Sequence, residues 1–145
     1  MSLKDLNMKP VANQGATLVL QHPADRTDLK QADGSNITIS LLGKDSDVYV
    51  KADNFVQNKR VEAAKRQVKF SNAEAQQQNA ETIARCTTSW SGIPKCWVEG
   101  GDDETPVEFS FDNAVKLYTT QRWVFEQADN FVGDRANFLK PASAT

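Results

Sequence analysis

The stretch Asn36-Ile37-Thr38-Ile39-Ser40-Leu41-Leu42-Gly43-Lys44-Asp45-Ser46 contains the change from a strand pattern to a helix pattern. Apolar and polar residues alternate from Ile37 to Leu41, which is typical of a half-buried strand. Ser46 is a favourable N-cap for a helix of about 20 residues. A second β-rich run occupies residues 16–20, and a polar segment that can turn the chain separates the two runs. We therefore predict that the two runs pair antiparallel, as a long-looped hairpin.

Helical periodicity follows Ser46 in two consecutive segments. The first helix is expected to bury one stripe, formed by Val48, Ala52, Phe55, Val56 and Ala63. A second helix is predicted to begin at Ser71, because Ser71 and Glu74 have the spacing of a capping box. Gly92 and Pro94 are expected to end it. Its predicted buried face consists of Ala80, Ile83, Ala84, Thr87 and Trp90.

The last third of the chain is predicted to form a small hairpin and two more helices. Residues 95–98 and 106–109 could pair as a second hairpin around an acidic turn, and Ser110 would cap a short helix. A final helix is predicted from about Gln121 to Leu139, with Gly133 marking a kink. Its apolar arc contains Val124, Ala128, Phe131, Val132, Phe138 and Leu139.

These patterns predict an α+β fold in one domain, which suits a length of 145 residues. We expect an N-terminal antiparallel β-hairpin, followed by four to five amphipathic helices with a small second hairpin. Residues 1–14 are expected to form a flexible or loosely docked arm, residues 15–140 the domain, and residues 141–145 a tail.

Composition and charge limit the kinds of partner. The chain has 17 Lys and Arg against 19 Asp and Glu, a net charge of −2 and a pI near 5.4, which does not suit a general nucleic-acid binder. No apolar run reaches the roughly 18–20 residues that span a bilayer, and the N-terminus lacks a signal-peptide pattern. We therefore expect a cytoplasmic protein that binds neither nucleic acid nor membranes, with Cys86 and Cys96 as reduced thiols.

The chemistry-bearing residues do not form a recognisable catalytic or metal-binding pattern. His22 is the single histidine, and no second ligand lies at metal-binding spacing from it. Cys86 lacks a nearby base that could activate it, so we expect a small, buried, inert thiol. The segment Asp102-Asp103-Glu104 does not fit an EF-hand loop and is interpreted as a solvated acidic turn. We expect no enzyme activity, no cofactor and no metal.

Interaction surfaces are the remaining candidates for a functional site. Residues 59–69 carry five basic side chains against Glu62, and residues 99–108 carry five acidic ones. Each segment is either a solvated face or one half of a complementary contact between copies. Lys59 falls inside the apolar arc of its helix and would have to snorkel. Trp123 lies off the arc of the last helix, so it either tucks under the second hairpin or is exposed for a partner. The candidate partner or self-association surface comprises Lys59, Arg60, Lys65, Arg66, Lys69, Asp102, Asp103, Glu104 and Trp123.

Several segments resemble proteins identified as tail assembly chaperones of long-tailed, siphovirus-type bacteriophages. In the C-terminal half they are Thr88-Ser89-Trp90-Ser91-Gly92, Val107-Glu108-Phe109-Ser110-Phe111-Asp112-Asn113-Ala114-Val115-Lys116-Leu117 and Gly133-Asp134-Arg135-Ala136-Asn137-Phe138-Leu139. The order of a short hairpin, a Leu-Leu-Gly-x-Asp-Ser turn at residues 41–46 and a charged helix is also similar. The resemblance covers about residues 16–139 and consists of caps and core residues rather than a catalytic signature.

The resemblance implies a protein that binds the tape measure protein before the tail tube polymerises and is absent from the finished virion. It also implies that a frameshift-extended form can recruit tail-tube subunits, and this chain would be the short form. Such a task suggests weak homo-oligomerisation along a long partner. The alternatives are a structural virion component, such as a neck or tail-completion subunit, and a small regulatory or nucleic-acid-binding protein that uses the basic helix.

Overall fold

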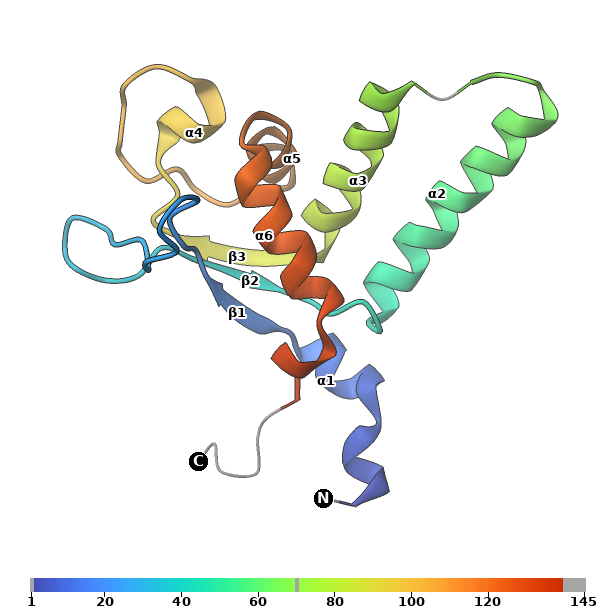
Figure 1. Cartoon of the computed structure of the whole chain (residues 1–145), viewed down its shortest axis with the longest axis horizontal. Coiled ribbons are helices and arrows are strands. Elements are labelled where there is room, and N and C mark those ends of the chain that lie inside the picture. Colours follow the sequence, from blue (N-terminus) through green and yellow to red (C-terminus); the bar gives the residue numbers. More distant parts are fainter. Residues whose placement is uncertain (1, 70, 140–145) are drawn as a thin grey trace.

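The computed structural model describes residues 2–69 and 71–139, and within them the chain has an α+β fold (Figure 1). Helices and the strands of one antiparallel sheet follow one another along the chain. In order they are η1 (Leu3–Leu6), α1 (Met8–Gln14), β1 (Ala16–Val19), β2 (Thr38–Leu41), α2 (Asp47–Lys65), α3 (Asn72–Cys86), β3 (Thr87–Ser91), α4 (Lys95–Glu99), α5 (Phe111–Thr120), α6 (Arg122–Gly133) and η2 (Arg135–Asn137).

The sheet has the strand order β1-β2-β3, and both pairings are antiparallel. Ala16 is opposite Leu41 and Val19 is opposite Thr38, which confirms the predicted N-terminal hairpin. Ile39 and Leu41 are fully buried on the face that α3, α5 and α6 cover (Figure 1). Strand side chains alternate between the two faces, so Thr17, Thr38 and Ser40 lie on the opposite face, together with Val19.

Residues 2–14 contain more regular structure than we expected of an arm. Helix α1 buries Ala12, whose carbonyl accepts a hydrogen bond from Gly43 N at 3.0 Å. Asn13 Oδ1 accepts a hydrogen bond from Asp47 N at 2.9 Å, which ties α1 to the first turn of α2. Pro10 is tolerated because it lies in the first helical turn, where backbone N–H groups have no helical partner. The expected tail, residues 141–145, lies outside the described residues.

The predicted helix starts are confirmed. Ser46 Oγ accepts a hydrogen bond from Tyr49 N, Ser71 Oγ from Glu74 N and Ser110 Oγ from Asn113 N, each at 3.1 Å. The capping box at Ser71 is only half formed. Its second half requires the Glu74 carboxylate to accept from the Ser71 backbone N–H, but the carboxylate accepts from Ser71 Oγ at 3.4 Å. These caps depend on residues three positions apart, so they can be predicted locally.

The second helix is shorter than predicted, and its expected end is a strand. Helix α3 stops at Cys86, and residues 87–91 form β3, which places Trp90 opposite Ile39 of β2. The prediction that Trp90 lies on the helix was therefore wrong. Threonine and tryptophan favour strands, and the open edge of β2 supplies hydrogen-bond partners that a helix would not use.

The second hairpin was also predicted wrongly in its details. Residues 95–99 form helix α4, and an isolated bridge between Pro94 and Pro106 stands in place of the expected strand pair. The final helix ends at Gly133 rather than Leu139, and η2 then returns the chain to the body. Phe138 is still buried, and its ring centroid lies 5.5 Å from that of Phe131.

Candidate protein-binding surfaces

Helix α2 stands at the edge of the molecule, where α3 covers only part of its apolar surface (Figure 1). Of the predicted stripe, Ala52 and Val56 are buried, whereas Val48 and Phe55 are 38% and 53% exposed. The expectation that the whole stripe is core was therefore wrong. We call Val48, Ala52, Phe55 and Ala63 the apolar flank of α2, since they follow one another at helical spacing along one side.

The apolar flank borders two shallow hollows that meet at Phe55. A hollow of about 440 Å³ is lined by Val48, Lys51, Ala52, Phe55 and Arg85. A second, of about 370 Å³, continues toward the end of α2 and includes Ala63, Arg66 and Val68. The charged residues of the first hollow are both cations, whereas Glu62 stands among the cations of the second. The first hollow therefore fits an apolar side chain with acidic neighbours.

Two cations beside the apolar flank rest on aromatic rings. Lys59 Nζ lies 4.6 Å from the centroid of the Phe55 ring, and the Arg85 guanidinium lies 5.2 Å from that of Phe111. Lys59 was predicted to lay its stem over the core, but it is exposed and covers Phe55 instead. Phe111 is 40% exposed, so it adds an apolar residue next to Arg85.

The predicted basic residues separate into two groups. Lys65, Arg66 and Lys69 are exposed at the end of α2 and in its connection to α3, together with Val68, which is 58% exposed. We call these four residues the basic tip. Arg60 instead lines a polar groove of about 180 Å³ with Tyr49, Asp53 and Asp129. Burial raises the pKa of Asp129, and burial together with Asp53 and Asp129 raises the pKa of Tyr49.

The predicted acidic residues lie in the loop after α4, where they have different roles. Asp103 Oδ1 accepts hydrogen bonds from Thr105 N at 2.9 Å and Thr105 Oγ1 at 2.7 Å, which lower the pKa of Asp103. Asp103 therefore shapes the loop, whereas Asp102 and Glu104 are simply exposed. No group of three or more His, Cys, Asp or Glu side chains within residues 2–69 and 71–139 is arranged to hold a metal ion.

A cleft of about 720 Å³ lies beside this loop, and we had not predicted it. The β1–β2 connection forms one wall and residues 92–106 form the other. Leu29, Ile37, Trp97 and Pro106 give the cleft apolar walls, and its charged lining residues are Asp33, Glu104 and Lys30, so acidic groups outnumber basic ones. We call it the acidic cleft. Sequence patterns could not indicate it, because it forms between two segments without helical or strand periodicity.

Trp123 is half-buried rather than free for a partner. Its ring lies 5.1 Å from that of Trp97 in an edge-to-face arrangement, and its Nε1 donates to Gln121 Oε1 at 3.2 Å. Of the two predicted arrangements, packing is the one observed, although α4 stands where the hairpin was expected. Trp90 is likewise fixed, because its Nε1 donates to Val107 O at 2.9 Å.

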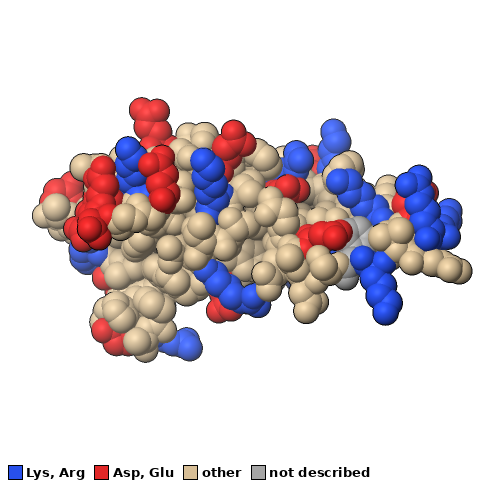
Figure 2. Space-filling view, turned by 90° about the horizontal axis from the view of Figure 1, so that it is seen from above, with Lys and Arg blue, Asp and Glu red and all other residues tan. Residues whose placement is uncertain are grey.

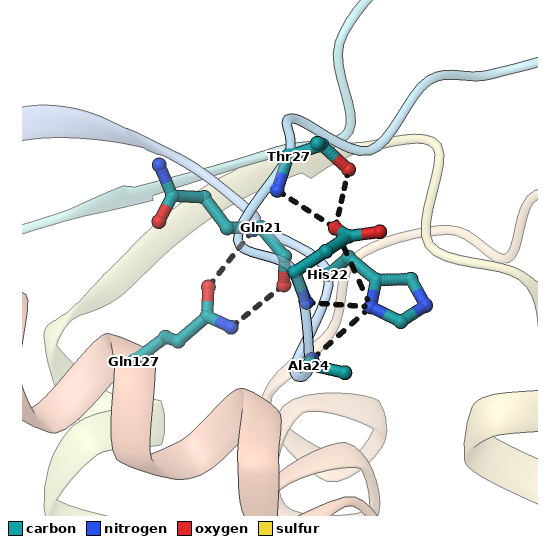
Figure 3. Close-up of polar contacts among 6 residues, drawn as sticks. Gln21, His22, Ala24, Thr27 and Gln127 are labelled. Atoms are coloured by element: carbon teal, nitrogen blue, oxygen red, sulfur yellow. Dashed lines mark hydrogen bonds and ion pairs between the residues drawn. The ribbon is translucent and has the colours of Figure 1, made fainter.

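His22 has a structural role in the connection between β1 and β2. Its Nδ1 accepts hydrogen bonds from Ala24 N at 3.1 Å and Asp25 N at 3.4 Å (Figure 3). Beside it, Gln127 of α6 holds the backbone of Gln21 through two hydrogen bonds of 2.9 and 2.8 Å (Figure 3). These bonds attach the β1–β2 connection to α6 and so help to position one wall of the acidic cleft.

The two cysteines differ in environment. Cys86 is fully buried, and burial raises its pKa to about 12, which keeps the thiol protonated and unreactive. Cys96 is half-buried in the lining of the acidic cleft. This environment of Cys86 agrees with the prediction of a buried thiol.

Comparison with protein-family models, curated proteins and solved structures found no match to this chain. Within the described residues, no helix combines the length and the apolar character needed to cross a bilayer. In the structure, residues 88–92 fall on β3, residues 107–117 on α5 with the residues before it, and residues 133–139 on the turn around η2.

Proposed function

We propose that this chain is a tail assembly chaperone of a long-tailed bacteriophage. In this role it binds the tape measure protein in the host cytoplasm, supports tail-tube assembly without catalysis and is absent from the mature virion. The resemblance of residues 88–92, 107–117 and 133–139 to such chaperones supports the proposal. A frameshift-extended form would bring tail-tube subunits to the same complex.

The apolar flank of α2 is the observation that carries this proposal. A helix of 19 residues is about 28 Å long, so α2 can lie beside several turns of a partner helix. Exposed Val48 and Phe55 offer anchoring positions two turns apart. Lys51 and Arg85 line the hollow between them and would favour acidic residues on the partner. A tape measure protein is a long helical chain whose apolar stripes need cover until the tube encloses it.

Co-expression with the tape measure protein of the encoding genome tests the proposal. A chaperone should keep the tape measure protein in the soluble fraction and elute with it in size-exclusion chromatography. The tape measure protein expressed alone should aggregate. Equal solubility of the tape measure protein with and without this chain, and separate elution, would contradict the proposal.

The alternative is a structural virion component, such as a neck or tail-completion subunit. The basic tip and the acidic cleft would serve this role as well as the proposed one. Mass spectrometry of purified particles separates the two, since a structural subunit would be found in them and a chaperone would not.

A further inference from the structure

Opposite charges lie at opposite ends of the long axis of the molecule. Figure 2 shows Lys and Arg gathered at the end where α2 and α3 meet, and Asp and Glu gathered at the end that holds α4 and its loop. The first end is the basic tip, and the second contains Asp102 and Glu104 beside the acidic cleft. In the described part of the chain, these charged side chains form no ion pairs. Their charges are therefore available to another molecule.

The two ends also complement each other in shape and polarity. The basic tip is a narrow projection that carries Val68, an apolar side chain 58% exposed, between Arg66 and Lys69. The acidic cleft is a hollow whose apolar walls include Leu29 and Trp97 and whose acidic residues are Asp33 and Glu104. The one cation among its described lining residues, Lys30, donates a hydrogen bond to Asn36 Oδ1. An exposed valine between two cations matches a hollow that has apolar walls and two carboxylates against one lysine, because both the burial and the charge pairing are favourable.

We propose that the basic tip of one copy inserts into the acidic cleft of the next, so that copies of this chain associate head to tail. Val68 enters the cleft, and Arg66 and Lys69 pair with Glu104 and Asp33. Because the two surfaces differ, the contact is heterologous and repeats from copy to copy into a ring or an open array. Val48 lies at the other end of α2 from the tip, so the first hollow of the apolar flank stays uncovered.

The strength of the contact should depend on salt. Exposed ion pairs contribute little individually, about 0.2–1 kcal/mol by double-mutant cycles, and salt screens them as the Debye length falls from about 10 Å at 0.1 M to about 3 Å at 1 M. Association should therefore be detectable at low salt and high protein concentration, and it should weaken as salt is added.

Sedimentation velocity of the full chain at about 0.1 M and about 1 M salt measures this dependence. The parent protein should show a concentration-dependent increase in sedimentation coefficient at low salt that is lost at high salt. Arg66→Glu should weaken association by about tenfold, since it replaces an attraction with a repulsion. Lys4→Glu makes the same change in net charge at a residue outside both the basic tip and the acidic cleft, so this variant should associate like the parent.

Two further variants test the pairing and the apolar contact separately. Arg66→Glu combined with Glu104→Lys in one chain should recover part of the association, because each contact again joins opposite charges. Val68→Asp should abolish association, whereas Val61→Asp, at a similarly exposed position (53%) on α2, should not. A parent that is monomeric at low salt, or an oligomer indifferent to the changes at Arg66 and Val68, would overturn the proposal. Tape measure binding by such a monomer would leave the proposed function standing.

Discussion

Thr87 Oγ1 lies 2.7 Å from Tyr118 Oη, in a contact that joins the first residue of β3 to α5 inside the core. Thr87 Oγ1 also donates to Ile83 O at 2.8 Å. Since the threonine hydroxyl has one hydrogen, Tyr118 donates in the shared bond. Both side chains are buried, at 5% and 3% exposure. The pair therefore fixes the place where α3 ends and the strand begins.

This geometry predicts unequal costs for removing the two hydroxyl groups. Tyr118→Phe should lower the free energy of unfolding by about 0.5–1.5 kcal/mol, because Thr87 keeps its bond to Ile83. Thr87→Val should cost more, about 1–3 kcal/mol, because it leaves the Tyr118 hydroxyl buried without a partner. Urea denaturation of both single variants and the double variant measures the coupling. Equal single costs that simply add in the double variant would contradict the bond.

Phe138→Ala should lower the free energy of unfolding by about 3–5 kcal/mol, as expected for a buried aromatic residue. Phe138 is 5% exposed and packs on Phe131. Phe111→Ala is the matched control, because Phe111 is 40% exposed and should cost much less. Both are measured by chemical denaturation. A Phe138→Ala variant that unfolds like the parent would show that this side chain does not contribute to the packing of the core.

The two thiols should differ in reactivity. In the native protein at about pH 8, Ellman's reagent should modify Cys96 and leave Cys86 untouched, because the reactive species is the thiolate. Burial raises the Cys86 pKa to about 12. Because a thiol in the unfolded chain ionises near pH 8.5, stability should fall as pH rises above that value. The native Cys96→Ser variant should not react with the reagent, and unfolding this variant should expose its single remaining thiol, that of Cys86. Rapid reaction of the native variant would contradict the burial of Cys86.

Sequence reasoning succeeded where neighbouring residues determine the structure. The caps at Ser46, Ser71 and Ser110 involve residues three positions apart, and the alternation from Ile37 to Leu41 defines one buried face. Strand β3 was missed because Thr87 and Trp90 continue the helical spacing of α3, while their pairing partners in β2 are about 50 residues earlier in the chain. Residues 96–98 are a short apolar run, for which periodicity does not separate helix from strand.

The candidate surfaces were only partly predictable for the same reason. The charges of residues 59–69 and 99–108 are visible in the sequence, but their placement at opposite ends of the molecule depends on the whole fold (Figure 2). Periodicity indicates which side of α2 is apolar, but not that α3 leaves Phe55 uncovered. Leu29 and Trp97 line the acidic cleft together although they are 68 positions apart in the sequence, and a local pattern cannot predict such a placement.

The binding of the tape measure protein by variants of α2 tests the central claim most directly. Phe55→Asp and Val50→Asp introduce the same charge into the same helix at positions 53% and 48% exposed, but only Phe55 lies on the apolar flank. We predict that Phe55→Asp lowers the affinity by at least about tenfold, since it removes an apolar anchor of the contact, and that Val50→Asp binds like the parent. Binding is measured by interferometry on the immobilised tape measure protein, with equal thermal stability of both variants as the control. Equal affinity of both variants and the parent would contradict the claim.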